Sequence, residues 1–192
     1  MLQYRGGQSM KIFFDTEFTG LHKGTELISI GMVDEVGRTF YAEFNDYDKN
    51  QIEDWIEDNV ISNLLFEDQV KFFRESQDTM ITNCKGNKEY IRKMLLDWLE
   101  GYDTIEFVSD VCHYDFVLLI DLISFNALDL PKNIAPVCID INQMLMEHYS
   151  MDANTAFDIN RERIIEVDDY NKHNSLHDAK VIKAIYNKIT NE

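Results

Sequence analysis

Residues 11–17 (KIFFDTE) carry two carboxylates at the end of an apolar run. Three apolar residues precede the first carboxylate, which is typical of a strand buried on both faces. Strand side chains alternate between the two faces, so Asp15 and Glu17 project from the same side. Two such carboxylates repel each other unless they share a cation or a proton, and oxygen ligands alone suit Mg²⁺ or Mn²⁺ rather than zinc. The chain must therefore fold around an acidic pair.

Strand-like and helix-like patterns alternate along the rest of the chain. Strands are predicted at 26–33, 38–44, 104–109 and 136–140, and helices at 51–66, 87–100, 114–125, 141–149 and 176–189. The first three strands form an antiparallel meander, after which helices and strands alternate. We therefore expect an α/β fold, a mixed five-stranded sheet flanked by helices on both faces. Residues 1–9 are expected to be a flexible N-terminus and residues 10–192 a single domain.

The composition fits a globular chain. With 192 residues, 45% of them hydrophobic, the chain can bury one full core without a metal or a disulfide. No apolar run approaches the roughly 20 residues of a membrane helix, and the first ten residues do not form a signal peptide. The three cysteines form no CxxC pair, which fits a reducing compartment. We expect a cytoplasmic location without membrane association.

The charge balance restricts any function that involves nucleic acid. Eighteen basic residues stand against 35 acidic ones, for a net charge of -17. Such a field repels polyanions, so binding would have to be local, through cations in a cleft or a short single-stranded end. Six basic residues gather in one stretch that could guide a nucleic-acid backbone, although a solvated helix face is the more ordinary interpretation: Lys71, Arg74, Lys85, Lys88, Arg92 and Lys93.

A second acidic candidate is Asp115, between the fourth predicted strand and the next helix. A carboxylate at the start of a helix is ordinarily an N-cap, and this alternative has about equal weight. Asp110, five residues earlier, is the competing acid.

The third candidate is the segment HNSLHDA, where His173 precedes Asp178 by five residues at the start of the last predicted helix. A histidine near metal-bound water is a natural general base at neutral pH. The alternative is a surface loop in which Asn174 or Ser175 caps the helix. His177 is interpreted as a surface residue or a neighbour of the site.

The three segments KIFFDTEFTGL, HYDFVLL and HNSLHDA resemble the three exonuclease motifs of the DEDDh superfamily. This superfamily includes ribonuclease T, oligoribonuclease and the proofreading subunits of bacterial replicative polymerases, all with a ribonuclease H-like fold. The chain is most similar to small bacterial exoribonucleases such as the mycobacterial polyadenylate-specific 3'-exoribonuclease. The resemblance spans residues 11–189, with the motifs in the right order and on the right elements.

The resemblance assigns roles to individual residues. It implies two Mg²⁺ or Mn²⁺ ions held by four carboxylates, with a histidine as the base: Asp15, Glu17, Asp115 and Asp178 as ligands, and His173. In relatives the stretch matching Phe18, Thr19, Gly20 and Leu21 touches the terminal nucleotide, although Phe18 or Leu21 could equally be packing residues. Many relatives have an asparagine where this chain has Val111, which puts in doubt any substrate contact of that asparagine.

The expected function is therefore metal-dependent 3'-to-5' exoribonuclease activity on single-stranded RNA, releasing nucleoside 5'-monophosphates. A DNA exonuclease of the proofreading or repair type is an alternative, because contacts to the 2'-hydroxyl cannot be placed from the sequence. Another alternative is a non-catalytic acidic interaction protein on the same fold. Relatives that pair also imply homodimerisation.

Overall fold

The computed structural model describes residues 9–67, 73–77, 80–166 and 172–191, so residues 1–8 of the predicted flexible N-terminus and Lys71 of the basic stretch lie outside it. The strands are β1 (Met10–Phe18), β2 (Leu27–Asp34), β3 (Thr39–Phe44), β4 (Phe73–Gln77), β5 (Ile81–Gly86), β6 (Ile105–Ser109) and β7 (Ile134–Asp140). The α-helices are α1 (Asp54–Asn59), α2 (Lys88–Leu99), α3 (Cys112–Ile123), α4 (Ile141–Tyr149), α5 (Ala153–Asp158), α6 (Arg161–Ile165) and α7 (Ser175–Asn191). Three short 3₁₀ turns join them: η1 (Lys49–Gln51), η2 (Ile61–Asn63) and η3 (Ala127–Asp129).

The strands form one mixed sheet in the order β4-β5-β3-β2-β1-β6-β7. The meander β1-β2-β3 is antiparallel, as the sequence predicts, whereas β6 runs parallel to β1 and β7 runs parallel to β6. The α/β class and the mixed sheet are confirmed. The predicted number of five strands is wrong, because the described residues give seven.

The two unexpected strands extend the sheet beyond β3. β5 pairs with β3 in parallel, and β4 pairs with β5 antiparallel. The sequence of β5, ITNCKG, has only two β-branched residues and ends in polar residues and glycine, so its strand propensity is weak. Its pairing depends on tertiary contacts: the buried Lys85 ammonium lies 3.3 Å from a Glu43 carboxylate oxygen and donates to the backbone carbonyl groups of Phe66 and Glu67.

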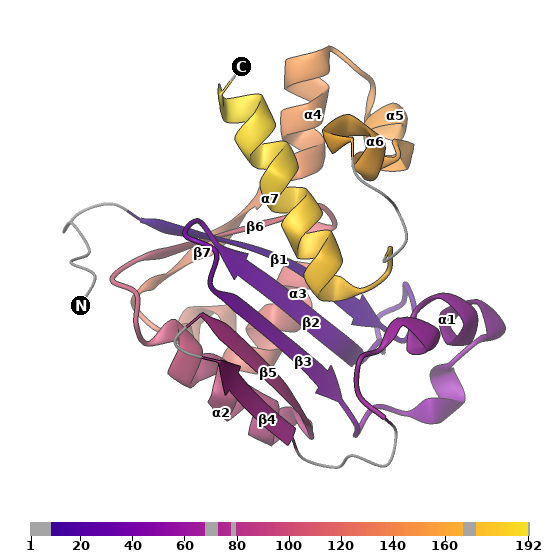
Figure 1. Cartoon of the computed structure of the whole chain (residues 1–192), viewed down its shortest axis with the longest axis vertical. Helices are drawn as coiled ribbons and strands as arrows, with labels where there is room; N and C mark the ends of the chain where they lie inside the picture. The colour runs from indigo at the N-terminus through magenta and orange to yellow at the C-terminus, as the bar shows by residue number, and fades with distance from the viewer. Residues whose placement is uncertain (1–8, 68–72, 78–79, 167–171, 192) are drawn as a thin grey trace.

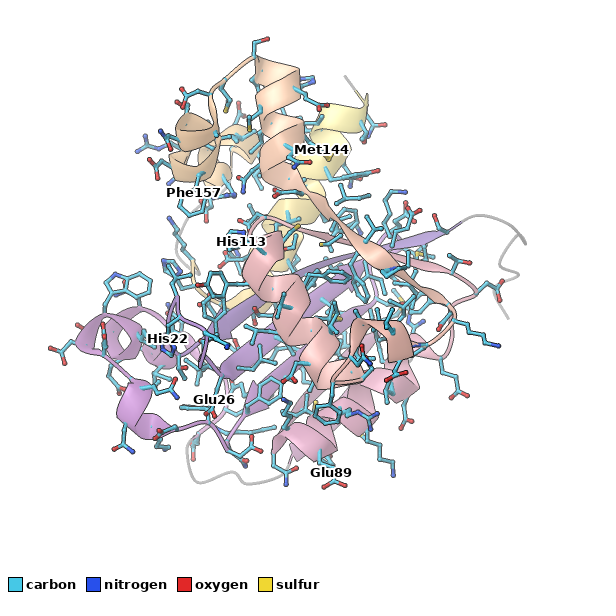
Figure 2. The ribbon with its side chains drawn as sticks, turned by 180° about the vertical axis from the view of Figure 1, so that it is seen from behind. His22, Glu26, Glu89, His113, Met144 and Phe157 are labelled. Carbon is cyan, nitrogen blue, oxygen red and sulfur yellow. The ribbon has the colours of Figure 1, made fainter. Side chains whose placement is uncertain are left out.

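Helices cover both faces of the sheet. α7 crosses β1 and β2 on one face, and α4, α5 and α6 form a group beside it (Figure 1). On the opposite face lie α2 and α3, with His113 at the first turn of α3 (Figure 2). Phe13 packs in the core under α7, whereas its neighbour Phe14 packs in the core under α2 and α3. β1 is thus buried on both faces, as its apolar run predicts.

The helix predicted at 51–66 is broken into η1, α1 and η2. Asn59, Ser62 and Asn63 each donate a side-chain hydrogen bond to the carbonyl four residues earlier, at 2.6 to 2.8 Å. Side chains that bond the backbone in this way weaken and bend helices. Between the helices predicted at 141–149 and 176–189, where the sequence predicts no element, the structure contains α5 and α6, capped by Asp152 and Asn160.

Across the described ranges, no helix is long and apolar enough to pass through a membrane.

Candidate active site

A cleft of about 570 Å³ opens where β1 and β6 end and α7 begins. Because β1 and β6 run parallel, their carboxyl ends meet at this edge of the sheet, the usual place for a ligand in such folds. All five residues predicted to be catalytic or metal-binding line this cleft: Asp15, Glu17, Asp115, His173 and Asp178.

Asp15 and Glu17 lie opposite two small residues of the neighbouring strand. In the β1–β2 register Asp15 pairs with Gly31 and Glu17 with Ser29. A Cβ atom on Gly31 would lie only 2.2 Å from the backbone nitrogen of Leu176, so glycine lets the start of α7 lie directly on β2. The Ser29 and Ser175 hydroxyls hydrogen-bond at 2.9 Å at the same place. These small residues bring the end of the third motif next to the carboxylates of β1.

Asp115 is held by two hydroxyl groups rather than by the end of its helix. The Thr16 hydroxyl donates to Asp115 Oδ1 at 2.6 Å, and the Ser109 hydroxyl donates to Oδ2. The N-cap of α3 is Val111, which makes no side-chain capping bond. The alternative of Asp115 as an N-cap is therefore wrong. Sequence reasoning missed that Thr16, the middle residue of the first motif, holds Asp115 in place.

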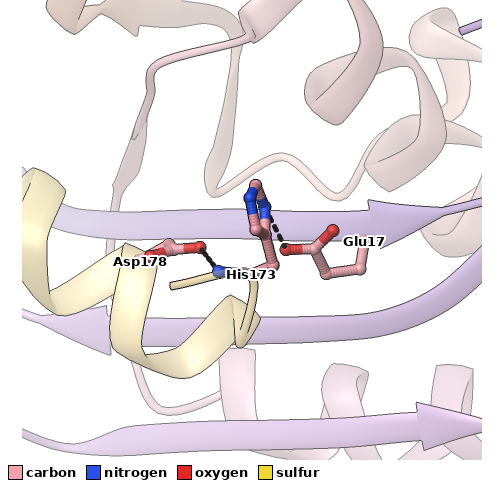
Figure 3. A group of neighbouring side chains, drawn as sticks. All are labelled: Glu17, His173 and Asp178. Carbon is pink, nitrogen blue, oxygen red and sulfur yellow. Dashed lines mark hydrogen bonds and ion pairs between the residues drawn. The ribbon is translucent and has the colours of Figure 1, made fainter. Parts of the chain in front are cut away.

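His173 and Asp178 are linked through the backbone (Figure 3). The His173 N–H donates to Asp178 Oδ2 at 2.9 Å, and His173 Nδ1 lies 3.9 Å from Glu17 Oε1. His173 has φ of 64°, in the left-handed region that few non-glycine residues adopt. This unusual backbone aims the imidazole at Glu17 while the amide stays bound to Asp178.

Neighbouring amide side chains hold the His173 loop. Asn63 Nδ2 donates to the carbonyl of Lys172 at 3.0 Å, and Asn174 Nδ2 donates to the carbonyl of Asn63 at 3.1 Å. Asn174 Oδ1 also accepts from the His177 N–H at 3.2 Å, which caps α7 as the alternative interpretation proposed. The cap at Asn174 is therefore compatible with a position of His173 in the cleft.

Three groups of potential ligands occur among the described residues, each with one ligand atom per residue within 4.8 Å of the others. They are Asp15 with Asp110 and Asp115; Glu17 with His173 and Asp178; and Glu162 with His177 and Asp178. Asp15 Oδ2 is buried without a hydrogen-bond partner among the described residues. The oxygen donors therefore fit a hard divalent cation, which would satisfy this atom and neutralise its neighbours.

Burial and mutual repulsion control the charges of the carboxylates. Burial, followed by repulsion from the neighbouring acids, raises the pKa values of Asp15 and Glu17 well above their ordinary values. Burial and the Asp110 charge raise the pKa of Asp115 to about 7 and that of Asp178 to about 8. Without a cation, the folded chain therefore holds protons at this site near neutral pH.

His173 has the opposite shift. Burial, with the positive charge of Lys172, lowers the pKa of His173 below its ordinary value. The imidazole is therefore neutral at pH 7 and free to accept a proton.

Asp110, mentioned in the sequence only as a competing acid, lies in the cleft as a further carboxylate. The Arg161 guanidinium on α6 holds it, with Nε 2.9 Å from Asp110 Oδ2, and also donates to Asn142 Oδ1 at 2.9 Å. Burial raises the pKa of Asp110, and Arg161 opposes this rise. Neither Arg161 nor the buried Glu162 belongs to a recognisable motif, so no sequence signal pointed to them.

The residues predicted to contact substrate have different surroundings. Leu21 is 69% exposed and lines the cleft together with Phe18, whose ring stacks on Tyr114 at 5.5 Å between centroids. The Thr19 hydroxyl is buried and donates to Gln51 Oε1 at 2.6 Å, so it supports the loop from inside. The substrate roles of all three stay predictions.

Two exposed aromatic residues that the sequence reasoning missed also line the cleft. The Trp55 and His173 rings form a T-shaped contact, with 5.0 Å between centroids. Phe157 lies on the side of α5 that faces the sheet (Figure 2).

Residues 10–190 match the family described as the 3'-5' exoribonuclease Rv2179c-like domain. The chain belongs to this family. Two curated relatives, the 3'-5' exoribonucleases Rv2179c and MT2234.1 from two Mycobacterium tuberculosis strains (H37Rv and CDC 1551 / Oshkosh), are each 32% identical to it over 113 residues. These matches cover 59% of this chain and 61% of each relative, so the chain spans about three fifths of the length of these relatives.

Solved structures of 3'-exonucleases share the fold of this family member. One, titled as the recognition of a histone mRNA stem-loop by a 3'-exonuclease, superposes with a TM-score of 0.61 and 16% identity, covering 94% of this chain and 63% of that one. A full-length 3'-exonuclease gives a TM-score of 0.62 and 16% identity, covering 95% and 82%. These structures support the ribonuclease H-like type of fold predicted from the motifs.

Proposed function

We propose that this chain hydrolyses single-stranded RNA from its 3' end and releases nucleoside 5'-monophosphates. The observation that carries the proposal is the convergence, in one cleft of an exoribonuclease-family chain, of a histidine and four carboxylates from three distant segments. Asp15, Glu17, Asp115 and Asp178 would hold two divalent ions, Mg²⁺ or Mn²⁺. When bound, such ions supply an activated water and stabilise the leaving oxygen.

The chain's own residues would accept the proton of the attacking water and stabilise the positive charge that results. His173 is neutral because burial lowers its pKa, so it can accept the proton that the attacking water loses. The imidazolium then formed lies with Nδ1 3.9 Å from the Glu17 carboxylate, which stabilises the positive charge. During this proton transfer, the hydrogen bond from the His173 N–H to Asp178 would hold the His173 loop in place.

The shape and charge of the cleft favour a short single strand. Cations at the carboxylates would give the scissile phosphate a positive seat in a chain with a net charge of -17. Trp55 and Phe157 are 56% and 52% exposed at the cleft and offer apolar surfaces to unpaired bases. Homodimerisation and a cytoplasmic location stay expectations from the sequence.

The proposal is tested with 5'-labelled single-stranded RNA and DNA oligonucleotides of one sequence, incubated with Mg²⁺, Mn²⁺ or EDTA. The expected result is a metal-dependent ladder that shortens from the 3' end and is faster on RNA. Asp15→Asn removes one ligand charge while keeping the side-chain size, and should abolish the ladder. A faster ladder on DNA would support the DNA exonuclease instead. The absence of a ladder on both substrates with every metal would favour an acidic interaction protein.

A further inference from the structure

Two of the three cysteines lie side by side although they are 26 residues apart. Cys112 is the first residue of α3 and Cys138 lies in β7, and the Cys112 thiol donates a hydrogen bond to Cys138 Sγ at 3.2 Å. Both side chains are half-buried, whereas Cys84 is fully buried in the core. The pair is therefore both close together and within reach of a small reagent.

The distance between the two sulfur atoms is well suited to a covalent bond. A disulfide has its sulfur atoms about 2.05 Å apart, so Cys112 and Cys138 need to approach by roughly 1.1 Å. β7 is the last strand of the described sheet on its side, and one of its residues, Val137, is 63% exposed. An edge strand next to the first turn of a helix can adjust by this amount without crossing the core.

We propose that Cys112 and Cys138 form a reversible dithiol–disulfide site whose oxidant is a small-molecule disulfide. The thiolate of one cysteine attacks a sulfur of the small disulfide, which gives a mixed disulfide and releases one small thiol that takes up the proton. The second cysteine attacks the protein sulfur of the mixed disulfide and displaces the second small thiol. Two protein thiols are thereby oxidised by two electrons, and one small disulfide is reduced to two thiols.

The cysteine pair is coupled to the carboxylates of the cleft. This coupling rests on the proposed metal-binding function. Cys112 Sγ lies 3.6 Å from the carbonyl of Ser109, whose hydroxyl holds Asp115, and 3.4 Å from the carbonyl of Ile139. Closing the bond moves Cys112 and Cys138 toward each other, and the share of this movement at Cys112 shifts the turn that carries Asp110 and leads to Asp115. Packed interiors transmit such shifts, so the disulfide form should bind divalent cations more weakly.

The charge around the pair selects the oxidant. Asp140 follows Cys138 by two residues, and the chain as a whole carries a net charge of -17. This field repels an anionic disulfide and attracts a cationic one. Cystamine should therefore oxidise the pair several-fold faster than glutathione disulfide at low ionic strength, and the difference should shrink in salt.

The test uses the full chain, reduced and then treated with cystamine, with mass spectrometry under non-reducing conditions. We expect a product lighter by two hydrogen atoms, a linked peptide pair containing Cys112 and Cys138, and full reversal by dithiothreitol. Cys112→Ser and Cys138→Ser should each stop at a mixed disulfide with one cysteamine. Cys84→Ser is the matched control and should form the bond like the wild type. Mixed disulfides on both cysteines, or two unreacted thiols, would overturn the proposal.

The coupling is measured separately by thermal unfolding at increasing Mn²⁺ concentration. The oxidised protein should need about tenfold more Mn²⁺ than the reduced protein for the same rise in Tm. Equal Mn²⁺ requirements in the two forms would overturn the coupling. A reduced protein that gains no stability from Mn²⁺ would count against the proposed metal site, while the mass measurement would still decide the disulfide.

Discussion

The first motif uses its three side chains in two ways. Asp15, Thr16 and Glu17 all line the cleft. Strand alternation places Thr16 on the opposite side of β1 from the two acids, and its hydroxyl donates to Asp115 at 2.6 Å. The strand alternation that places two carboxylates on one side therefore also connects the first motif to the second. Sequence reasoning found the two acids and missed the hydroxyl between them.

Replacing Thr16 tests this connection. Thr16→Val keeps the shape but removes one of the two hydroxyl donors to the buried Asp115, and a buried acceptor left without its hydrogen bond costs about 1–3 kcal/mol. We expect the affinity for Mn²⁺, followed by calorimetric titration, to fall about tenfold. Thr16→Ser retains the hydroxyl and should bind Mn²⁺ nearly as the wild type does. Equal affinities for the valine variant and the wild type would remove Thr16 from the site.

His173 offers the sharpest test of chemistry as distinct from metal binding. His173→Ala should lower kcat on RNA by about 10²- to 10⁴-fold, the usual contribution of a general base. The bond that its backbone N–H donates to Asp178 survives in alanine, so Tm and Mn²⁺ affinity should change little. His148→Ala, at an exposed position in α4, is the matched control. An undiminished kcat in His173→Ala would exclude this residue as the base.

At the scale of elements, the site depends on how closely α7 approaches the sheet. Ser29 and Gly31 face Glu17 and Asp15 across the β1–β2 ladder, and the start of α7 lies against them. This close contact brings the first turn of α7, which carries Asp178, to the cleft.

A methyl group at Gly31 should separate the two elements. In Gly31→Ala the new Cβ would lie 2.2 Å from a backbone atom of α7, so either the helix or the strand must move. We expect a loss of about 3 kcal/mol or more in the free energy of unfolding by urea, and about 10²-fold lower activity in the folded fraction. Gly24→Ala, whose Cβ meets nothing closer than 3.7 Å, is the control. A stable, active Gly31→Ala protein would contradict this account of the site.

Some strands and helices could be predicted from the sequence, and others could not. The apolar run of β1 and the apolar spacing of α2 are local signals, and both elements formed where expected. β5 has no such signal, because its pairing depends on the buried Lys85 and its partners in a distant loop. Asp110 and Arg161 come together only after α6 has packed, which no local pattern encodes.

The residues of the site can likewise be divided into those that a sequence pattern predicts and those that only the packed structure reveals. Asp15, Glu17, Asp115, His173 and Asp178 could be found because their types and order match a family pattern, and the structure brings all five to one cleft. Gly31 and Ser29 could not, because their importance follows from a strand register that the sequence does not reveal.

At the level of the whole molecule, part of the repulsion between acidic side chains is concentrated among the buried carboxylates of the cleft. Asp115 and Asp178 have folded-state pKa values of about 7 and about 8, above the roughly 3.9 of an aspartate in an unfolded chain. The folded state thus keeps protons that the unfolded state releases. This contribution to stability is complete below about pH 4 and is lost as the pH rises through the folded pKa values.

Metal-free protein should therefore become less stable toward alkaline pH. In EDTA we expect Tm to fall by about 5 °C or more between pH 5.5 and pH 8.5. Asp178→Asn removes one of the shifted groups and should flatten this dependence. Saturating Mn²⁺ in place of EDTA should reverse the loss above pH 7, since cations favour the ionised carboxylates. A Tm that is independent of pH in EDTA would contradict the buried repulsion.

Anomalous scattering from crystals grown with Mn²⁺ and a nucleoside 5'-monophosphate would show directly whether the cleft holds two metal ions. We predict two manganese peaks among Asp15, Glu17, Asp115 and Asp178, with the phosphate of the nucleotide beside them and His173 facing it. Manganese bound elsewhere, with no peak at the four carboxylates, would contradict the assignment of this cleft as the site of phosphodiester hydrolysis.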